Sequence, residues 1–242
     1  MTRLAILLIA ILLPFPTHSQ DLVADISSHE VQVTTGFTGA NLIVFGSMER
    51  SGDIAIVVEG PTARATVRQK SRMMGIWVNT DSYIFDDVPG YYAVASSKPV
   101  ADMLSPATIA NKKLTLDKVD FPVRKNDARA ETFRQALIQR RQYRGFYSQQ
   151  PGGVTVQSGH LFRSAFALPA NVPMGPYNVY VYLIRDGHIQ SMQKVVFSVD
   201  EIGLSATIFE AAKNYSVLYA FASLLMAIAM GGGSAWLFRR MS

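Results

Sequence analysis

The sequence of 242 residues contains no cysteine. Disulfides, thiolate metal sites and cysteine nucleophiles are therefore excluded, and the fold must rest on a hydrophobic core, which a chain of this length can supply. The chain between its two ends also carries little net charge. Without Arg3, Arg239 and Arg240, the 23 basic side chains fall to 20, against 18 acidic ones. Nucleic-acid-binding domains are usually strongly basic, so the sequence argues against this class.

Patterns typical of catalysis are missing as well. Beyond the first 19 residues, His29, His160 and His188 stand in separate contexts without the short spacings of a metal site. Asp86 and Asp87 are adjacent, so on a strand they would point to opposite faces, and we interpret them as part of a polar loop. The sequence also lacks a nucleophile elbow, a phosphate loop and a dinucleotide fingerprint. We predict no catalytic residue, metal or cofactor, and no enzyme activity.

The N-terminal segment, residues 1–19, has the pattern of a secretory signal peptide. A basic start precedes the apolar run Leu4–Leu13, and the small residues Thr17 and Ser19 precede a predicted cleavage site before Gln20. As a helix the apolar run would be about 15 Å long, half of a bilayer core of about 30 Å. Its length favours a signal peptide over an anchor.

The C-terminal segment is long enough to span a membrane. Residues 217–238 contain no charged side chain, and a helix of this length would measure about 33 Å. A juxtamembrane linker, 206–216, precedes it. The tail 239–242 begins with two arginines, which favours a cytoplasmic C-terminus. We predict a single-pass protein of the bacterial inner membrane with its N-terminal domain in the periplasm.

Small residues recur at every fourth position of this span, namely Ser223, Ala227, Gly231 and Ala235. They share one side of a helix, where small side chains let a second membrane helix approach closely. The alternative is that glycine and alanine are simply common in membrane spans. We keep both interpretations.

Short β-branched runs such as Asp53–Val58 and Tyr177–Ile184 predict strands, with turn residues at intervals of about 8–12 residues. Asp186-Gly187 predicts a hairpin turn. We expect a mainly β fold with a helical insertion. The N-terminal β-sandwich-like module comprises residues 20–98, and the C-terminal β module comprises residues 148–205. They form either two Ig-like β-sandwich modules, which we prefer, or one sandwich.

The intervening segment, 99–147, is predicted to be helical. Ser105 followed by proline is typical of a helix start. A second helix is expected to open at Asn126-Asp127, to run to about Arg144 and to stop at Gly145, with Ala130, Phe133 and Leu137 on its apolar face.

Two clusters are candidate binding surfaces. Trp77, Tyr83, Phe85, Tyr91 and Tyr92 could line a groove for a glycan, a peptide or an organic anion, since flat aromatic faces stack on such ligands. The alternative places them in a sandwich core with tyrosine hydroxyls at its edge.

The second cluster is basic. Arg140, Arg141 and Arg144 follow other cations in the stretch from Arg124, and they could contact anionic lipid or an acidic partner. The alternative is a solvated helix face that complements the helix dipole.

Several sequence blocks resemble a known family. They are Thr34–Ala40, Gly75–Asn79, Val88–Val94, Leu168–Pro173 and Tyr180–Gly187, of which Gly-Ile-Trp-Val-Asn is the most specific. Together they resemble the alphaproteobacterial transmembrane-protein family, a group of exported single-span proteins of unassigned function. The resemblance covers nearly the whole chain after the signal peptide. It implies a membrane partner, a multi-span permease of the sulfite-exporter type.

The functional hypothesis is a membrane-anchored periplasmic interaction or accessory protein that partners a permease or an envelope complex. A periplasmic ligand-binding protein that uses the aromatic cluster around Trp77 is the alternative. An enzyme of unknown class comes third.

Overall fold

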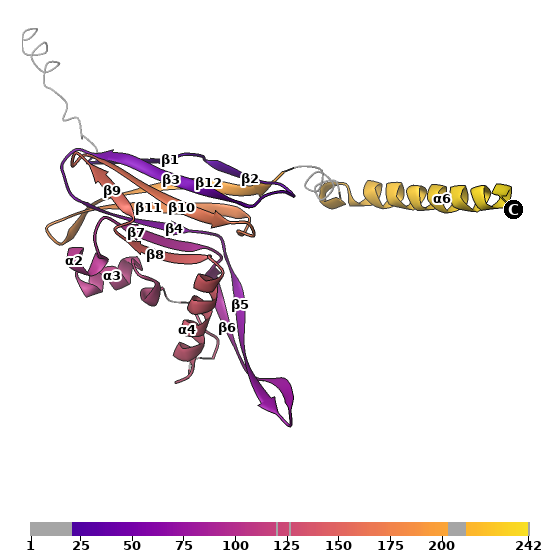
Figure 1. Cartoon of the computed structure of the whole chain (residues 1–242), viewed down its shortest axis with the longest axis horizontal. Helices are drawn as coiled ribbons and strands as arrows, with labels where there is room; N and C mark the ends of the chain where they lie inside the picture. Colours follow the sequence, from indigo (N-terminus) through magenta and orange to yellow (C-terminus); the bar gives the residue numbers. More distant parts are fainter. Residues whose placement is uncertain (1–20, 120, 126, 203–211, 242) are drawn as a thin grey trace, which may run out of the picture.

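The computed structural model (Figure 1) describes residues 21–119, 121–125, 127–202 and 212–241. The predicted signal peptide lies outside these residues. The fold is mainly β, with a helical segment between two groups of strands and an apolar helix at the C-terminus, which confirms the predicted fold class.

Two sheets form a sandwich. The four-stranded sheet has the order β1 (Leu22–Ile26), β3 (Gly39–Met48), β10 (Leu161–Pro169) and β9 (Val154–Gln157). The six-stranded sheet has the order β2 (Glu30–Val33), β12 (His188–Glu201), β11 (Gly175–Arg185), β4 (Asp53–Glu59), β7 (Tyr92–Ser96) and β8 (Tyr147–Pro151). Neighbouring strands are antiparallel except at the pairs β12·β2 and β7·β8.

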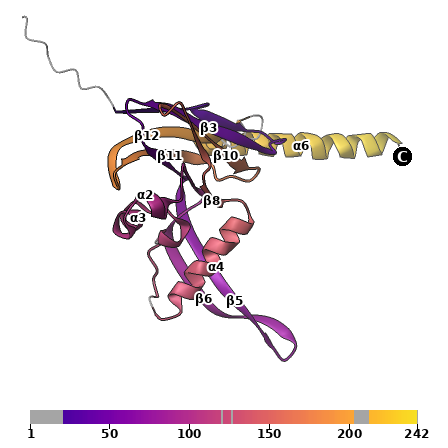
Figure 2. The same ribbon diagram turned by 60° about the vertical axis from the view of Figure 1, so that its left-hand side comes forward.

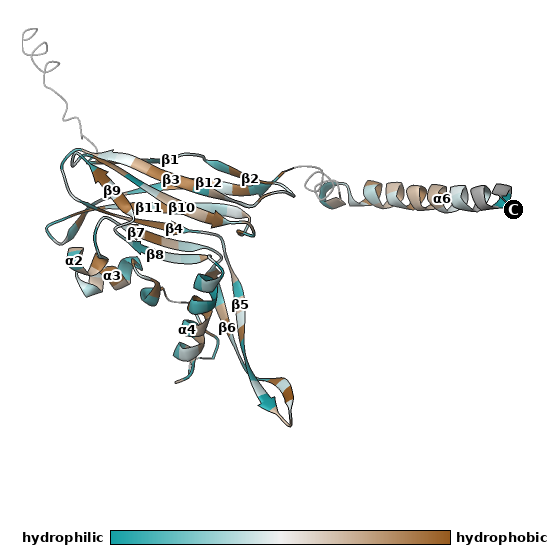
Figure 3. Ribbon diagram, viewed as in Figure 1, coloured by the Kyte–Doolittle hydropathy of each residue, from teal (hydrophilic) through white to brown (hydrophobic). Residues whose placement is uncertain are grey.

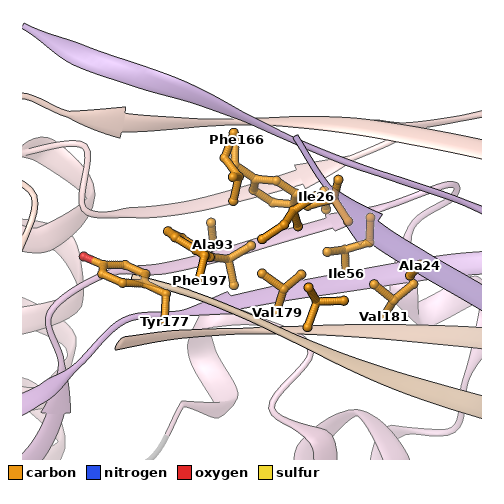
Figure 4. Close-up of a cluster of buried hydrophobic side chains, with 14 of the residues drawn as sticks. Ala24, Ile26, Ile56, Ala93, Phe166, Tyr177, Val179, Val181 and Phe197 are labelled. Carbon is orange, nitrogen blue, oxygen red and sulfur yellow. The ribbon is translucent and has the colours of Figure 1, made fainter. Parts of the chain in front are cut away.

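The main core lies between the sheets. In β10, alternate residues such as Phe162 and Phe166 are buried, as expected for a strand with one solvated face. Figure 4 shows Phe166 facing Ile56, Val179 and Phe197 across the sandwich. Because β4 is covered on both faces, its residues Ile54–Val58 are all buried and no alternation is visible.

The preference for two separate modules is wrong. Strands on either side of the helical segment pair directly, β10 with β3 and β11 with β4, so the two groups form one sandwich. The physical reason is that consecutive strands β3 and β4 enter different sheets, and each needs neighbours from the second group. Residue alternation predicts that a strand exists but does not specify its partner.

Short helices cover the outer face of the six-stranded sheet (Figure 2): α2 (Val100–Met103), α3 (Pro106–Lys112), η1 (Leu116–Lys118) and α4 (Ala130–Tyr143). The predicted start at Ser105 is confirmed, since its hydroxyl accepts a hydrogen bond from the Thr108 N–H. The α4 helix begins later than expected because the Asp127 side chain bonds the Arg129 N–H in a turn. Its buried face includes the predicted Ala130, Phe133 and Leu137, with Ile138 beside them.

A two-stranded hairpin leaves the sandwich. Strands β5 (Thr62–Met73) and β6 (Ile76–Pro89) form a sheet of their own, apart from an isolated bridge between Phe85 and Val123, and the hairpin extends away from the other sheets (Figure 1). We call β5 and β6 together the arm. The α4 helix lies beside its inner part, whereas its outer end is free (Figure 2).

The C-terminal helix α6 spans Ser216–Met241. Among the described residues it is the one helix long and apolar enough to cross a membrane, through the window Ser216–Ser234, and none of that window is buried against the domain. Apolar residues follow its length in Figure 3. The predicted span, residues 217–238, falls inside this helix.

Candidate functional site

The structure separates the aromatic residues that were expected to line a groove. Tyr83, Phe85, Tyr91 and Tyr92 are buried, whereas Trp77 is 66% exposed at the outer end of the arm. The core alternative therefore applies to four of the five. Tyr91 enters the core between the sheets, and Tyr92 enters the core beneath the helices, because adjacent residues on a strand point to opposite faces.

Their hydroxyl groups serve structural contacts. The Tyr91 hydroxyl donates to the Ala167 carbonyl at 3.0 Å and so connects the two sheets, while the Tyr92 hydroxyl donates to the Lys113 carbonyl at 2.6 Å. Burial raises the pKa of both tyrosines above the ordinary value. These hydroxyls remain protonated donors and are committed to the fold.

The outer end of the arm is the most exposed apolar feature of the described domain. We call residues 73–78 the arm tip. Ile76 is 68% exposed, Met74 is fully exposed, and Met73, Trp77 and Val78 are exposed as well. Met74 and Gly75 form the turn, with φ of 50° and 85°, the left-handed pair typical of a type I′ hairpin.

Sequence reasoning selected Trp77 but grouped it with its buried neighbours. A better signal was available in Met-Met-Gly-Ile-Trp-Val, an apolar run across a turn where polar residues normally stand. The same run overlaps the most specific block of the family resemblance, Gly75–Asn79.

The side chains behind the tip are basic. Arg68, Lys70 and Arg72 are exposed on β5, and the sequence has no acidic residue from Gly60 to Thr80. We call these three residues the basic collar. The first carboxylate beyond it, Asp81, is engaged by the Arg129 guanidinium at 2.8 Å. The outer part of the arm therefore carries an uncompensated positive charge.

The inner end of the arm is fixed by ionic contacts. Asp86 accepts hydrogen bonds from Arg64 at 2.8 Å and Arg124 at 3.1 Å, which together hold its pKa below the ordinary value. Asp87 lies in a bulge of β6, with a left-handed φ of 53°, and is exposed. The two aspartates therefore lie in strand β6 and not in the predicted polar loop, and Asp86 is a structural anion.

A second contact joins the arm to the turn before α4. The Tyr83 hydroxyl donates to the Asp127 carboxylate at 2.6 Å, and this bond is the main reason that the pKa of Asp127 falls to about 2. Lys125 lies 3.3 Å from the same carboxylate. The base of the arm is therefore attached to the helical segment by side chains from both.

The predicted arginine cluster is only partly free. Arg140 and Arg144 are exposed near the C-terminal end of α4. Arg141 instead lies over the Phe146 ring, 5.6 Å from its centroid, and its guanidinium is 3.5 Å from the Gly90 carbonyl oxygen. Arg141 therefore helps to hold α4 against the sheet.

The histidines lie apart. His29 contacts Asp25 at 3.3 Å, His160 lies near the Met48 carbonyl, and His188 begins β12. Within the described ranges, no group of three His, Cys, Asp or Glu residues is placed to hold a metal ion.

The small residues of α6 whose side chains are described are exposed, like their described neighbours on the helix. Ser223 and Ala227 are exposed, the Ser223 hydroxyl bonds the Tyr219 carbonyl at 2.8 Å, and a Cβ on Gly231 would meet no atom within 4 Å. The side chain of Ala235 lies outside the described side chains.

Fold and helix together define a class: a β-sandwich domain joined to one candidate membrane-spanning helix. The family described as "Putative transmembrane protein (Alph_Pro_TM)" matches residues 21–240, and the chain belongs to this family. Comparison with the curated proteins gave no match.

Proposed function

We propose that this protein is a membrane-anchored accessory protein whose β-sandwich lies in the periplasm and whose partner is another membrane protein. The observation that carries the proposal is the isolation of α6. Its apolar side chains, including Leu224, Met226 and Ile228, are exposed, while the sandwich has its own closed core. An apolar surface of this length needs either lipid or another helix to cover it.

A multi-span permease of the sulfite-exporter type is the partner that the family resemblance suggests, with an envelope complex as the broader possibility. The role is non-enzymatic. The ligand-binding alternative is weakened because four of the five aromatic side chains that it requires are buried in the cores, and Trp77 is separated from them at the arm tip.

Orientation is tested with reporter fusions. A reporter that is active only outside the cytoplasm should be active when it is fused after Glu201 and silent when it is fused after Ser242. The opposite pattern would exclude a periplasmic domain and with it the proposed function.

Partnership is tested by crosslinking in native membranes, followed by identification of the copurified chains. Gly231→Leu places a large side chain on the small-residue side of α6 and should abolish the crosslink to the membrane partner. Met230→Leu, one position away, nearly conserves volume and should leave the crosslink intact. If neither variant alters a partner crosslink, α6 acts as an anchor alone.

A further inference from the structure

The arm tip is not explained by the stability of the fold. Its side chains project beyond both cores, and Met74 places a bulky residue in a left-handed turn position that asparagine or glycine would occupy with less strain. A residue that is both strained and fully exposed suggests that its side chain contacts another molecule.

Both faces of the arm tip carry an apolar side chain, and Trp77 shares its face with Arg72. Met73 pairs with Ile76 across the hairpin, and the next pair, Arg72 and Trp77, points to the opposite face. A protein surface that docked on the arm would cover one face and leave the other in water. Lipid surrounds an inserted hairpin on all sides, so the distribution of apolar side chains favours a lipid environment.

The basic collar adds charge complementarity. Arg72 lies level with Trp77, and Lys70 and Arg68 follow further from the turn, so all three would meet the headgroups if the tip entered a bilayer. Basic side chains at this depth are attracted to anionic lipids, and tryptophan prefers the membrane interface. From the turn inwards, the apolar residues Met74 and Ile76 come first, then Trp77 beside Arg72, and then Lys70 and Arg68, which follows the order of layers in a membrane surface.

We propose that the arm tip inserts into the anionic headgroup region of the same membrane that holds α6. The anchor keeps the arm close to the bilayer, so a weak second contact is sufficient for stable attachment. β5 has 12 residues, about 40 Å of extended chain, which would hold the sandwich away from the surface on two supports. This inference rests on membrane anchoring by α6 and is independent of any protein partner.

The test uses Trp77 as a probe in the full chain. The sequence has two tryptophans, and Trp236→Phe leaves Trp77 as the only one. The protein is placed, one copy per disc, in lipid nanodiscs of phosphatidylcholine with or without phosphatidylglycerol. With the anionic lipid we expect a blue-shifted Trp77 emission, quenching by brominated acyl chains and protection from iodide. High salt should weaken these effects, since it screens the attraction.

Variants separate the contributions of the tip and the collar. Met74→Asn suits the left-handed turn better but removes the leading apolar side chain, so most of the bromine quenching should be lost. Met174→Asn is the matched control, because Met174 is an exposed loop methionine on the sandwich and should not affect the probe. Replacing Arg68, Lys70 and Arg72 with glutamine should remove the dependence on anionic lipid.

Three results would overturn the inference. Trp77 could stay accessible to iodide in every lipid composition. It could become buried only in discs that hold two copies, which would identify a second copy of the chain as the contact. It could stay exposed in discs yet crosslink to another protein in native membranes. The discs contain no other protein, so a negative Trp77 result in discs does not contradict the proposed accessory function. Conversely, loss of the partner crosslink in native membranes does not contradict insertion of the arm tip.

Discussion

The sandwich and the arm both contain strands with consecutive apolar residues, yet they bury these side chains in opposite ways. In β4, five consecutive residues, Ile54–Val58, are buried on both faces of the sheet. In β6, five consecutive residues, Ile76–Thr80, are all exposed. Apolar content alone therefore does not identify the core of this protein. In the sandwich it stabilises the fold, and at the arm tip it remains available for a contact with something else.

A second contrast lies within the arm itself. Its inner end is held by α4, by the Arg64 and Arg124 contacts to Asp86 and by the Tyr83 contact to Asp127. Its outer end is held by backbone pairing and a two-residue turn. Fixed at the base and free at the tip, the arm can present Trp77 at a defined position relative to the sandwich.

Truncating one isoleucine in each region should give the largest difference in the free energy of unfolding. Ile56→Ala removes a fully buried side chain between the sheets and should lower the free energy of unfolding by about 2–5 kcal/mol. Ile76→Ala at the arm tip should change it by less than about 0.5 kcal/mol. Denaturant unfolding of the purified full chain in detergent measures both. Equal losses would show that the arm tip packs against the domain.

Glycine substitutions in the two regions should give smaller losses of stability, each with a different cause. A Cβ on Gly46 would lie 2.6 Å from the Phe162 ring and against the Val23 carbonyl oxygen, so Gly46→Ala should cost about 1–3 kcal/mol through overpacking. A Cβ on Gly75 would meet no atom within 4 Å, but φ there is 85°. Gly75→Ala should therefore cost about 1–2 kcal/mol through backbone strain confined to the turn.

The two glycine effects differ in where they appear. Gly46→Ala should lower the midpoint of global unfolding, whereas Gly75→Ala should accelerate amide hydrogen exchange in the outer arm and leave that midpoint unchanged. A shift of the global midpoint by Gly75→Ala would mean that the arm and the sandwich unfold as one unit.

Local patterns predicted much of the secondary structure. The Asp186-Gly187 turn adopts the expected left-handed pair, with φ of 50° and 76°, and Ser105 caps its helix. The edge strand β8 was missed because Tyr147–Pro151 is mostly polar and only Tyr147 is buried in it. Its position depends on parallel pairing with β7, which is a long-range property.

The candidate site was predicted less well, for a related reason. Trp77 and Tyr83 lie six residues apart in one strand, and sequence proximity suggested one surface. In the structure α4 covers Tyr83, with the Phe133 ring 4.2 Å from the tyrosine ring, and leaves Trp77 beyond its reach. The boundary between core and surface in the arm is thus set by where a distant helix packs.

Acid pH gives the smallest expected effect and acts on the base of the arm. The Tyr83 hydroxyl, the Arg129 N–H and Lys125 hold the pKa of Asp127 at about 2, below the ordinary 3.8. A carboxyl group whose pKa is lowered in the folded protein stabilises the fold at pH values above its ordinary pKa. That contribution is lost as the pH falls from 3.8 towards 2. The core between the sheets consists of hydrophobic residues and lacks such a contact.

We therefore expect amide protection at the base of the arm to decrease across this pH range before protection in β4 does. Asp127→Asn should reproduce part of the decrease at neutral pH, because a neutral amide accepts the Tyr83 hydrogen bond more weakly than a carboxylate. Asp87→Asn, in the exposed bulge nearby, is the matched control and should leave protection unchanged. Hydrogen exchange followed by mass spectrometry resolves the two regions. If arm and β4 lose protection in parallel, or if Asp127→Asn behaves like the control, the Tyr83–Asp127 contact does not hold the arm in place. Its position would then depend on the packing of α4 and on the two arginines at Asp86.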